Sequence, residues 1–227
     1  MNDLYIVVEG KGEQTFIDRV VAPHLAKARV WVYASLIGKP GHKGGVRSWV
    51  STRKDLVHFL KMNRPDRPVH VTTMFDFHRL PLDWPGRKPP SDMPIHRRAT
   101  TVEELLLADV SQSMGEGFIP DRFIPYVQMH ELEALILSQA SALSAEFPNR
   151  CVEIQRLVDA VKDANPEEID DGPNTAPSAR IIAEVPEYKG RKASAAPNVL
   201  EQIGLEHLRF RCPHFEQWMT KLETLGS

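Results

Sequence analysis

The architecture of this protein is indicated first by the stretch Leu4-Tyr5-Ile6-Val7-Val8-Glu9-Gly10. A short run of apolar and β-branched residues that ends abruptly at an acid and a glycine is typical of a buried parallel strand. From Glu13 the apolar spacing changes, and Phe16, Ile17, Val20 and Val21 recur at helical intervals. This period predicts a helix directly after the strand. The chain therefore begins as a strand–turn–helix unit.

The alternation of strands and helices continues to about residue 138. Thr101 and Glu104 match a capping box, which predicts that a helix starts near Thr101. Strands that alternate with helices favour an α/β fold with a parallel sheet covered on both faces. After the first strand and helix, the expected strands are 30–34, 69–75 and 123–128, and the expected helices are 48–61 and 101–114.

The remaining sequence contains only helix and turn patterns. We therefore expect two parts, an α/β domain over residues 1–138 and a helical C-terminal subdomain over residues 139–227. With 42% hydrophobic and 26% charged residues among 227, the chain can build a sizeable core. A whole-chain disordered, collagen-like or coiled-coil structure is excluded.

Composition also bears on the compartment. No apolar run approaches the roughly 18 residues of a membrane span, and the acid Asp3 disfavours a signal peptide. The two cysteines, Cys151 and Cys212, are too few for a disulfide framework. We expect a cytoplasmic protein without a membrane partner. A net charge of -2 argues neither for nor against nucleic acid, so any such binding needs a local basic surface.

Carboxylates follow three of the four expected strands. The first strand ends at Glu9, the third ends at Asp76, and the fourth leads into Glu131 and Glu133. Ligands of open parallel sheets bind beyond the carboxyl ends of the strands. Acids that converge there repel one another unless a cation lies between them. Oxygen ligands of this kind suit Mg²⁺, Mn²⁺ or Ca²⁺ better than zinc.

Each of these acids also has an ordinary structural interpretation. A single acid at a strand end is usually a helix cap or a solvated loop residue. Glu131 and Glu133 share one face if they lie on a strand, and they diverge at an ordinary acidic helix start if they lie on a helix. Glu13 is either a first-turn helix acid or a further ligand in the crevice. His130 is either a proton donor or a core histidine.

Cations near these strand ends are candidate phosphate ligands. The glycine-rich loop 38–45 lacks the Gly-Lys-Ser/Thr of a P-loop, but it carries Lys39 and Lys43 and is followed by Arg47. Its amides and cations suit a phosphate, although a plain surface turn is an equal alternative. Arg79, just after Asp76, is a fourth candidate. The basic segments at residues 87–98 and 189–192 are either solvated faces or phosphate-neutralising surfaces.

The strand ending in Glu9-Gly10, the nearby Glu13 and the strand ending in Asp76 resemble the Toprim domain of topoisomerases, primases and overcoming-lysogenization-defect nucleases. More narrowly, the chain resembles an uncharacterised bacterial Toprim-like family, domain of unknown function 4276. The stretches that carry the resemblance span almost the full length: Val7–Gly10, Gly38–Gly45, Thr72–Phe77, Gln128–Leu135, Asp171–Ser178 and Cys212–Phe215.

The resemblance implies a four-stranded parallel sheet and a divalent-metal site. It implies that Glu9 is the first-strand acid and that Asp76 is the first acid of an Asp-x-Asp motif. His78 stands where the second acid belongs. Either His78 coordinates the metal, or Glu131 or Glu133 completes the ligand shell, or the site is impaired.

Two functions of different classes follow. The first is a Mg²⁺- or Mn²⁺-dependent nuclease in which Glu13 or His130 relays a proton and the basic residues hold phosphate. The resemblance implies a prophage or anti-phage context, DNA more than RNA as the substrate, and a separate ATPase subunit. The second is a non-catalytic module that binds nucleic acid or a partner. The sequence leaves open whether the chain forms a homo-oligomer.

Overall fold

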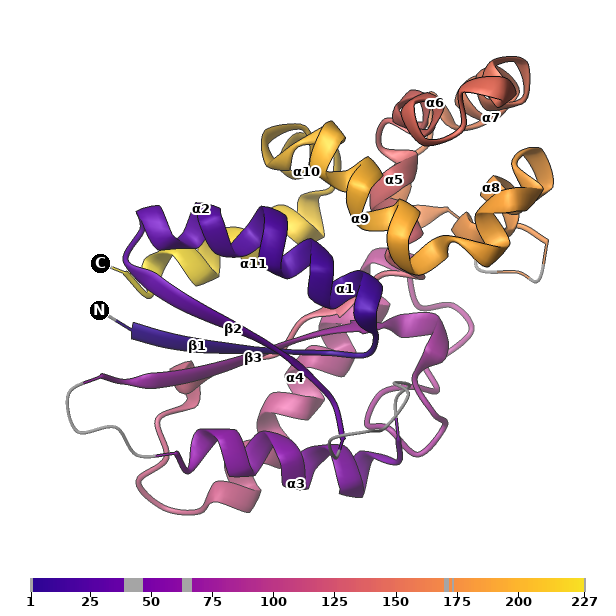
Figure 1. The fold of residues 1–227 in the computed structure, drawn as a ribbon. Helices are drawn as coiled ribbons and strands as arrows, with labels where there is room; N and C mark the ends of the chain where they lie inside the picture. Colours follow the sequence, from indigo (N-terminus) through magenta and orange to yellow (C-terminus); the bar gives the residue numbers. More distant parts are fainter. Residues whose placement is uncertain (1, 39–46, 63–66, 170–171, 173, 227) are drawn as a thin grey trace.

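The computed structural model describes residues 2–38, 47–62, 67–169, 172 and 174–226. Its centre is a parallel sheet with the strand order β2-β1-β3-β4, in which β5 also pairs with β3. Figure 1 shows the three long strands, β1, β2 and β3. The expected α/β class with a parallel sheet is confirmed. The strands are β1 Asn2–Val8, β2 Val30–Leu36, β3 Val69–Asp76, β4 Phe123–Ile124 and β5 Val127–Gln128.

The continuous apolar run of β1 is explained by burial on both faces. Leu4, Ile6 and Val8 belong to the hydrophobic cluster on one face of the sheet. Tyr5 and Val7 belong to the cluster on the other face. Successive side chains of a strand point to opposite faces, so a strand covered on both sides needs apolar residues at every position.

The expected fourth strand is present as two short pieces. Pro125 has no N–H to donate to a sheet ladder, and the chain is interrupted at Pro125 and Tyr126 between β4 and β5. The hydroxyl of Thr73 bridges the interruption, because it donates to the carbonyl oxygen of Tyr126 at 2.8 Å and accepts from its N–H at 2.9 Å. Both pieces still run beside β3.

Helices cover both faces, as expected (Figure 1). One face is covered by α1 (Lys11–Phe16), a π-helical turn at Ile17–Val21, α2 (Ala22–Lys27) and α11 (Pro213–Thr224). The opposite face is covered by α3 (Trp49–Leu60) and α4 (Ile95–Met114).

The predicted start of α4 at Thr101 is wrong. The helix begins at Ile95, directly after Pro94. Thr101 lies inside the helix, and its hydroxyl donates to the carbonyl oxygen of Arg97 at 2.8 Å. A threonine can make this bond to the preceding turn of a helix as readily as it can cap one. The Thr101/Glu104 pair therefore matched the capping pattern without forming a cap.

The C-terminal part is helical, as expected. The sequence pattern predicts a helix over 199–203, whereas α9 begins at Lys192, and the pattern predicts no helix at α10. In the described ranges, no helix is both long and apolar enough to cross a membrane. After α5 (Glu133–Leu137), which ends just before this part, the helices are α6 Leu143–Glu146, α7 Cys151–Val161, α8 Pro177–Glu184, α9 Lys192–Ile203 and α10 Leu205–Arg211.

The last helix, α11, returns to the sheet. Trp218 donates from Nε1 to the Thr72 hydroxyl at 2.8 Å, and its ring stacks on Tyr126 with 4.4 Å between centroids. Phe215 packs near Phe16, 6.1 Å between centroids. One hydrophobic cluster thus contains residues from before and after position 139. The division into domains at that position stays a prediction.

Candidate functional site

The two acids predicted at strand ends lie side by side. Glu9 follows β1 directly and Asp76 is the last residue of β3, and these strands are neighbours in the sheet. The N–H of Asp76 donates to Oε1 of Glu9 at 2.7 Å. Only 4% of Glu9 and 6% of Asp76 are exposed. The parallel register therefore buries two carboxyl groups at one edge of the sheet.

A turn after β5 brings Glu131 and Glu133 to the same edge. The N–H of Leu132, between them, donates to Oδ1 of Asp76 at 3.0 Å. Both glutamates are buried. Glu131 precedes the helix and Glu133 is the first residue of α5. The two glutamates therefore lie neither on one strand nor on one helix.

His130 makes the turn that positions these acids. Its backbone has φ 63°, in the left-handed region that few non-glycine residues adopt. Its carbonyl oxygen accepts from the N–H of His78 at 3.2 Å, and its side chain is buried. Backbone conformations of this kind gather at functional sites, where the surroundings hold them in place.

Three groups from the C-terminal part hold the two glutamates. The N–H of Ser178 donates to Oε2 of Glu131 at 3.0 Å. Oε1 of Glu133 accepts from the Tyr188 hydroxyl at 3.2 Å and lies 3.5 Å from Nζ of Lys192. Sequence reasoning did not assign these three residues to the site. The resemblance covered Ser178, and Lys192 was in a basic segment, but Tyr188 carried no signal.

Glu13 combines the two interpretations given to it. It lies in the first turn of α1, which begins after Gly10. Its side chain folds back, because Oε2 lies 2.9 Å from the position that a Cβ on Gly10 would occupy. Its negative charge contributes to raising the pKa of both Glu9 and Asp76. Glu13 is therefore a first-turn acid that also faces the other carboxylates.

Among the described residues, the carboxyl groups at this edge outnumber the cations, and several have raised pKa values. Burial, and then repulsion from Glu13, raises the pKa of Glu9 to about 8. Burial and repulsion from Glu9, Glu13 and Glu133 raise the pKa of Asp76 well above its usual range. Burial also raises the pKa of Glu133, against the opposing charge of Lys192.

In the part of the chain that the structure describes, Arg79 is the second cation at this edge. Its Nε lies 3.8 Å from Oδ2 of Asp76, and 57% of its side chain is exposed. Five carboxyl groups (Glu9, Glu13, Asp76, Glu131 and Glu133) thus share Arg79 and Lys192. We call these five residues the carboxylate cluster.

The chemistry of the carboxylate cluster fits a divalent cation. Buried oxygen ligands with raised pKa values are what a hard cation would neutralise. Among the described residues, however, no group of three or more His, Cys, Asp or Glu side chains is arranged to hold a metal ion. Oε1 of Glu9 and Oδ1 of Asp76 each accept a hydrogen bond from a backbone N–H group. Coordination by three carboxylates therefore requires side chains to rotate.

The other predicted site residues lie apart from the cluster or outside the described chain. His78 is exposed on the 3-10 turn Phe77–Arg79, and no hydrogen bond in the described structure joins its imidazole to the acids. Arg47 forms an ion pair with Asp55 at 2.7 Å. Lys39 and Lys43 lie outside the described residues.

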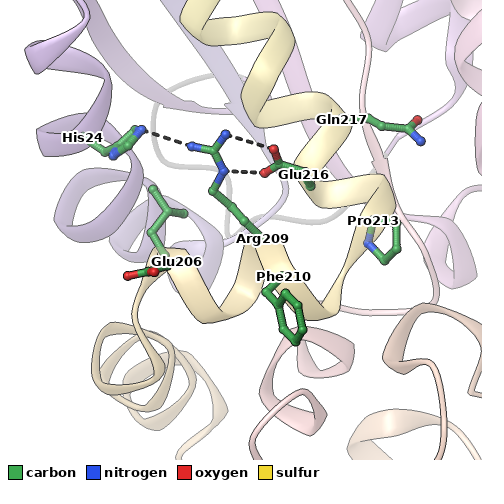
Figure 2. A pocket seen from close by; sticks show the side chains of 8 residues that line it. His24, Glu206, Arg209, Phe210, Pro213, Glu216 and Gln217 are labelled. Carbon is green, nitrogen blue, oxygen red and sulfur yellow. Dashed lines mark hydrogen bonds and ion pairs between the residues drawn. The ribbon is translucent and has the colours of Figure 1, made fainter.

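A large pocket of about 820 Å³ lies elsewhere, between α2, α10 and α11 (Figure 2). Its wall contains Arg209, which bonds through two nitrogens to Glu216 and also contacts His24. Phe210 beside it is 81% exposed. No member of the carboxylate cluster lines this pocket, so pocket size does not identify the candidate site.

Comparison with known proteins gives a family but no activity. No curated protein matches the sequence. One similar solved structure is the C-terminal region of the Burkholderia pseudomallei OLD protein, with 14% identity, a TM-score of 0.47, and coverage of 99% of this chain and 98% of that chain. Another is the C-terminal region of the Xanthomonas campestris pv. campestris OLD protein, with 19% identity, a TM-score of 0.34, and coverage of 96% and 95%.

The family membership expected from the quoted stretches is confirmed. A family model matches residues 8–223, which include every member of the carboxylate cluster and the helices that hold it. The chain belongs to the family described as domain of unknown function DUF4276.

Proposed function

We propose that this protein is a divalent-metal-dependent nuclease of the Toprim type, which hydrolyses phosphodiester bonds at the carboxylate cluster. The observation that carries the proposal is the burial of four carboxyl groups at one sheet edge, with a fifth facing them and two cations nearby. Carboxyl groups buried close together destabilise a fold, so a cluster of them indicates a site for chemistry or for a ligand. A cation-binding site explains why they are retained.

The proposed roles follow from position. Glu9 and Asp76 would hold Mg²⁺ or Mn²⁺, with Glu131 or Glu133 completing the ligands. A metal bound there would supply a water of lowered pKa and charge stabilisation at the phosphate. Glu13, which is half-buried beside the other acids, would exchange a proton with the reacting groups. The buried His130 is the alternative proton donor. Arg79 is exposed enough to pair with a phosphate oxygen.

Tyr188 and Lys192 have positioning roles in this proposal. Both contact Oε1 of Glu133, so they fix one carboxylate oxygen and leave the other to turn toward a ligand. The family resemblance, and not the geometry, favours DNA over RNA, a phage-related context and a separate ATPase subunit. The cytoplasmic location and the oligomeric state stay predictions.

The direct test is cleavage of supercoiled plasmid, linear DNA and RNA with Mg²⁺ or Mn²⁺. The site variant is Glu9→Gln/Asp76→Asn, which keeps side-chain shape and removes both ionisable carboxyl groups. The matched control is Glu104→Gln/Glu116→Gln, two exposed acids, one in the middle of α4 and one just after it. We expect cleavage by the wild type and the control and none by the site variant. Equal cleavage by the site variant would contradict the assignment.

A non-catalytic function is the second candidate. The observation that favours it is His78, which replaces the second acid of the motif and is exposed. In that case the cluster edge binds nucleic acid or a partner protein without hydrolysis. Nucleic-acid binding that persists while no substrate is cut, with either metal, would support this function over the first.

A further inference from the structure

The connection from β3 into α4 is strongly basic. Residues 77–98 contain five Arg or Lys residues against two Asp, in a chain whose net charge is -2. One of these acids, Asp83, faces the start of α3, where its Oδ2 accepts from the N–H of Trp49 at 2.9 Å. The segment therefore presents excess positive charge. Its cations are Arg79, Arg87, Lys88, Arg97 and Arg98.

One end of this segment is attached to the carboxylate cluster. Arg79 lies 3.8 Å from Asp76. Arg87 fixes the turn that carries Arg79, since it donates to the carbonyl oxygens of Leu80 at 2.9 Å and His78 at 3.3 Å. Its guanidinium also lies 4.7 Å from the centre of the Phe77 ring. Carbonyl oxygens and an aromatic face orient a guanidinium without cancelling its charge.

The other end of the segment returns to the same sheet edge. Arg97 lines a cavity of about 390 Å³ together with Met129 and His214. Met129 follows Gln128, which is the residue paired with Asp76 in the sheet. Arg97, at the start of α4, therefore lies near the residue that follows β5, at the sheet edge that carries Asp76.

Two cations of this segment form no ion pair with a described residue. They are Lys88 and Arg97, and both are exposed. Two acids line the same cavity as Arg97: Glu168 lies 3.8 Å from His96, and the Glu167 carboxylate accepts from the N–H groups of His214 and Phe215. A carboxylate cluster repels a polyanion, and cations beside it are needed to bring one close.

We propose that Lys88, Arg97 and Arg98, continued by Arg79, form a track for the phosphodiester backbone of nucleic acid that leads to the carboxylate cluster. This inference rests on the proposed function for its ligand, and it adds the surface and the residues that bind it. The track contacts phosphates and not base edges, so it lends affinity without sequence preference.

The test is fluorescence anisotropy with labelled single-stranded and duplex DNA and with RNA, over a range of salt concentrations. EDTA is present, so that hydrolysis cannot interfere. The track variant is Lys88→Gln/Arg97→Gln. The matched control, Lys27→Gln/Lys162→Gln, removes two exposed lysines from α2 and from the end of α7.

We expect the track variant to bind every sequence several-fold more weakly than the wild type. Its log–log salt slope should be smaller by about two, one for each lost phosphate contact. The control should match the wild type. No binding by the wild type, or equal affinity and slope in the track variant, would overturn the inference. The cleavage assay is separate: track-dependent binding without cleavage contradicts only the proposed function, and cleavage with unchanged binding contradicts only the track.

Discussion

Glu9 and Asp76 are joined by a hydrogen bond from the backbone N–H of Asp76 to the side-chain carboxyl group of Glu9. Asp76 donates its N–H to Glu9 and accepts from the N–H of Leu132, so the acids of β1, β3 and the turn after β5 are tied together. The consequence is electrostatic. Burial, and then the neighbouring carboxylates, raise the pKa of Glu9 and of Asp76, so the metal-free site favours the protonated forms of these two acids.

This predicts a pH dependence of stability in the metal-free protein. The pKa of Glu9 is about 8 in the folded state against 4.5 for an unperturbed glutamate. The folded state therefore holds this proton more tightly, and the free energy of unfolding falls as the pH rises through that interval. Thermal melts in EDTA should show a decline in Tm that is smaller in Glu9→Gln. Parallel curves for the two proteins would contradict the shifted pKa.

Gly10→Ala tests the position of Glu13. Gly10 has φ -143°, which alanine tolerates, but the new Cβ would lie 2.9 Å from Oε2 of Glu13. We expect the Glu13 side chain to move, with little change in Tm and a clear loss of cleavage. Gly12→Ala is the control, because its Cβ would meet Ala193 at an ordinary 3.7 Å. Full activity of Gly10→Ala would show that the placement of Glu13 is unimportant.

At the scale of elements, α11 joins the end of the chain to its centre. Trp218 is 2% exposed, stacks on Tyr126 and bonds to Thr72 of β3. Tyr126 lies in the interruption between β4 and β5, and its backbone is held by Thr73. The helix therefore supports the broken strand that leads to His130 and the two glutamates.

Trp218 should be a major contributor to stability. Trp218→Ala removes a buried ring and its hydrogen bond, and we expect it to lower the free energy of unfolding by about 3–5 kcal/mol. Trp218→Phe keeps much of the stack and loses the bond to Thr72, at about 1 kcal/mol. Urea denaturation followed by circular dichroism measures both. Equal, small effects would mean that α11 is only loosely attached.

The strand ends were predictable because Glu9 follows an uninterrupted apolar run and Asp76 follows a strand rich in β-branched residues that ends in Met74 and Phe75. The start of α4 was not, because Thr101 can bond within a helix as well as cap one. Tyr188 and Lys192 could not be assigned from local patterns, since only tertiary packing brings α9 and the turn before it to Glu133. Local sequence thus identifies the acids, and the residues that hold them require the fold.

At the scale of the whole molecule, the C-terminal helices complete both the core and the site. One hydrophobic cluster runs from β1 through α1 to α9 and α11. Ser178, Tyr188 and Lys192 reach back to Glu131 and Glu133. The helical part is consequently structural support for the carboxylate cluster.

A fragment of residues 1–138 should not behave as an independent domain. It would expose the apolar face that α9 and α11 cover and would leave Glu131 and Glu133 without their partners. We expect the fragment to lack a cooperative thermal transition and to be digested rapidly by protease, unlike the full chain. A soluble fragment with a sharp unfolding transition would instead establish a separable N-terminal domain.

The most direct test of the metal site is calorimetric titration of Mn²⁺ into the full chain at about pH 7, in buffers of different ionisation enthalpy. We expect binding that releases protons, because the Glu9 carboxyl, with a pKa of about 8, is protonated before the metal binds. Glu9→Gln/Asp76→Asn should not bind, and Glu104→Gln/Glu116→Gln should bind as the wild type does. No binding by the wild type, or equal binding by the Glu9/Asp76 variant, would contradict a metal centre at these strand ends.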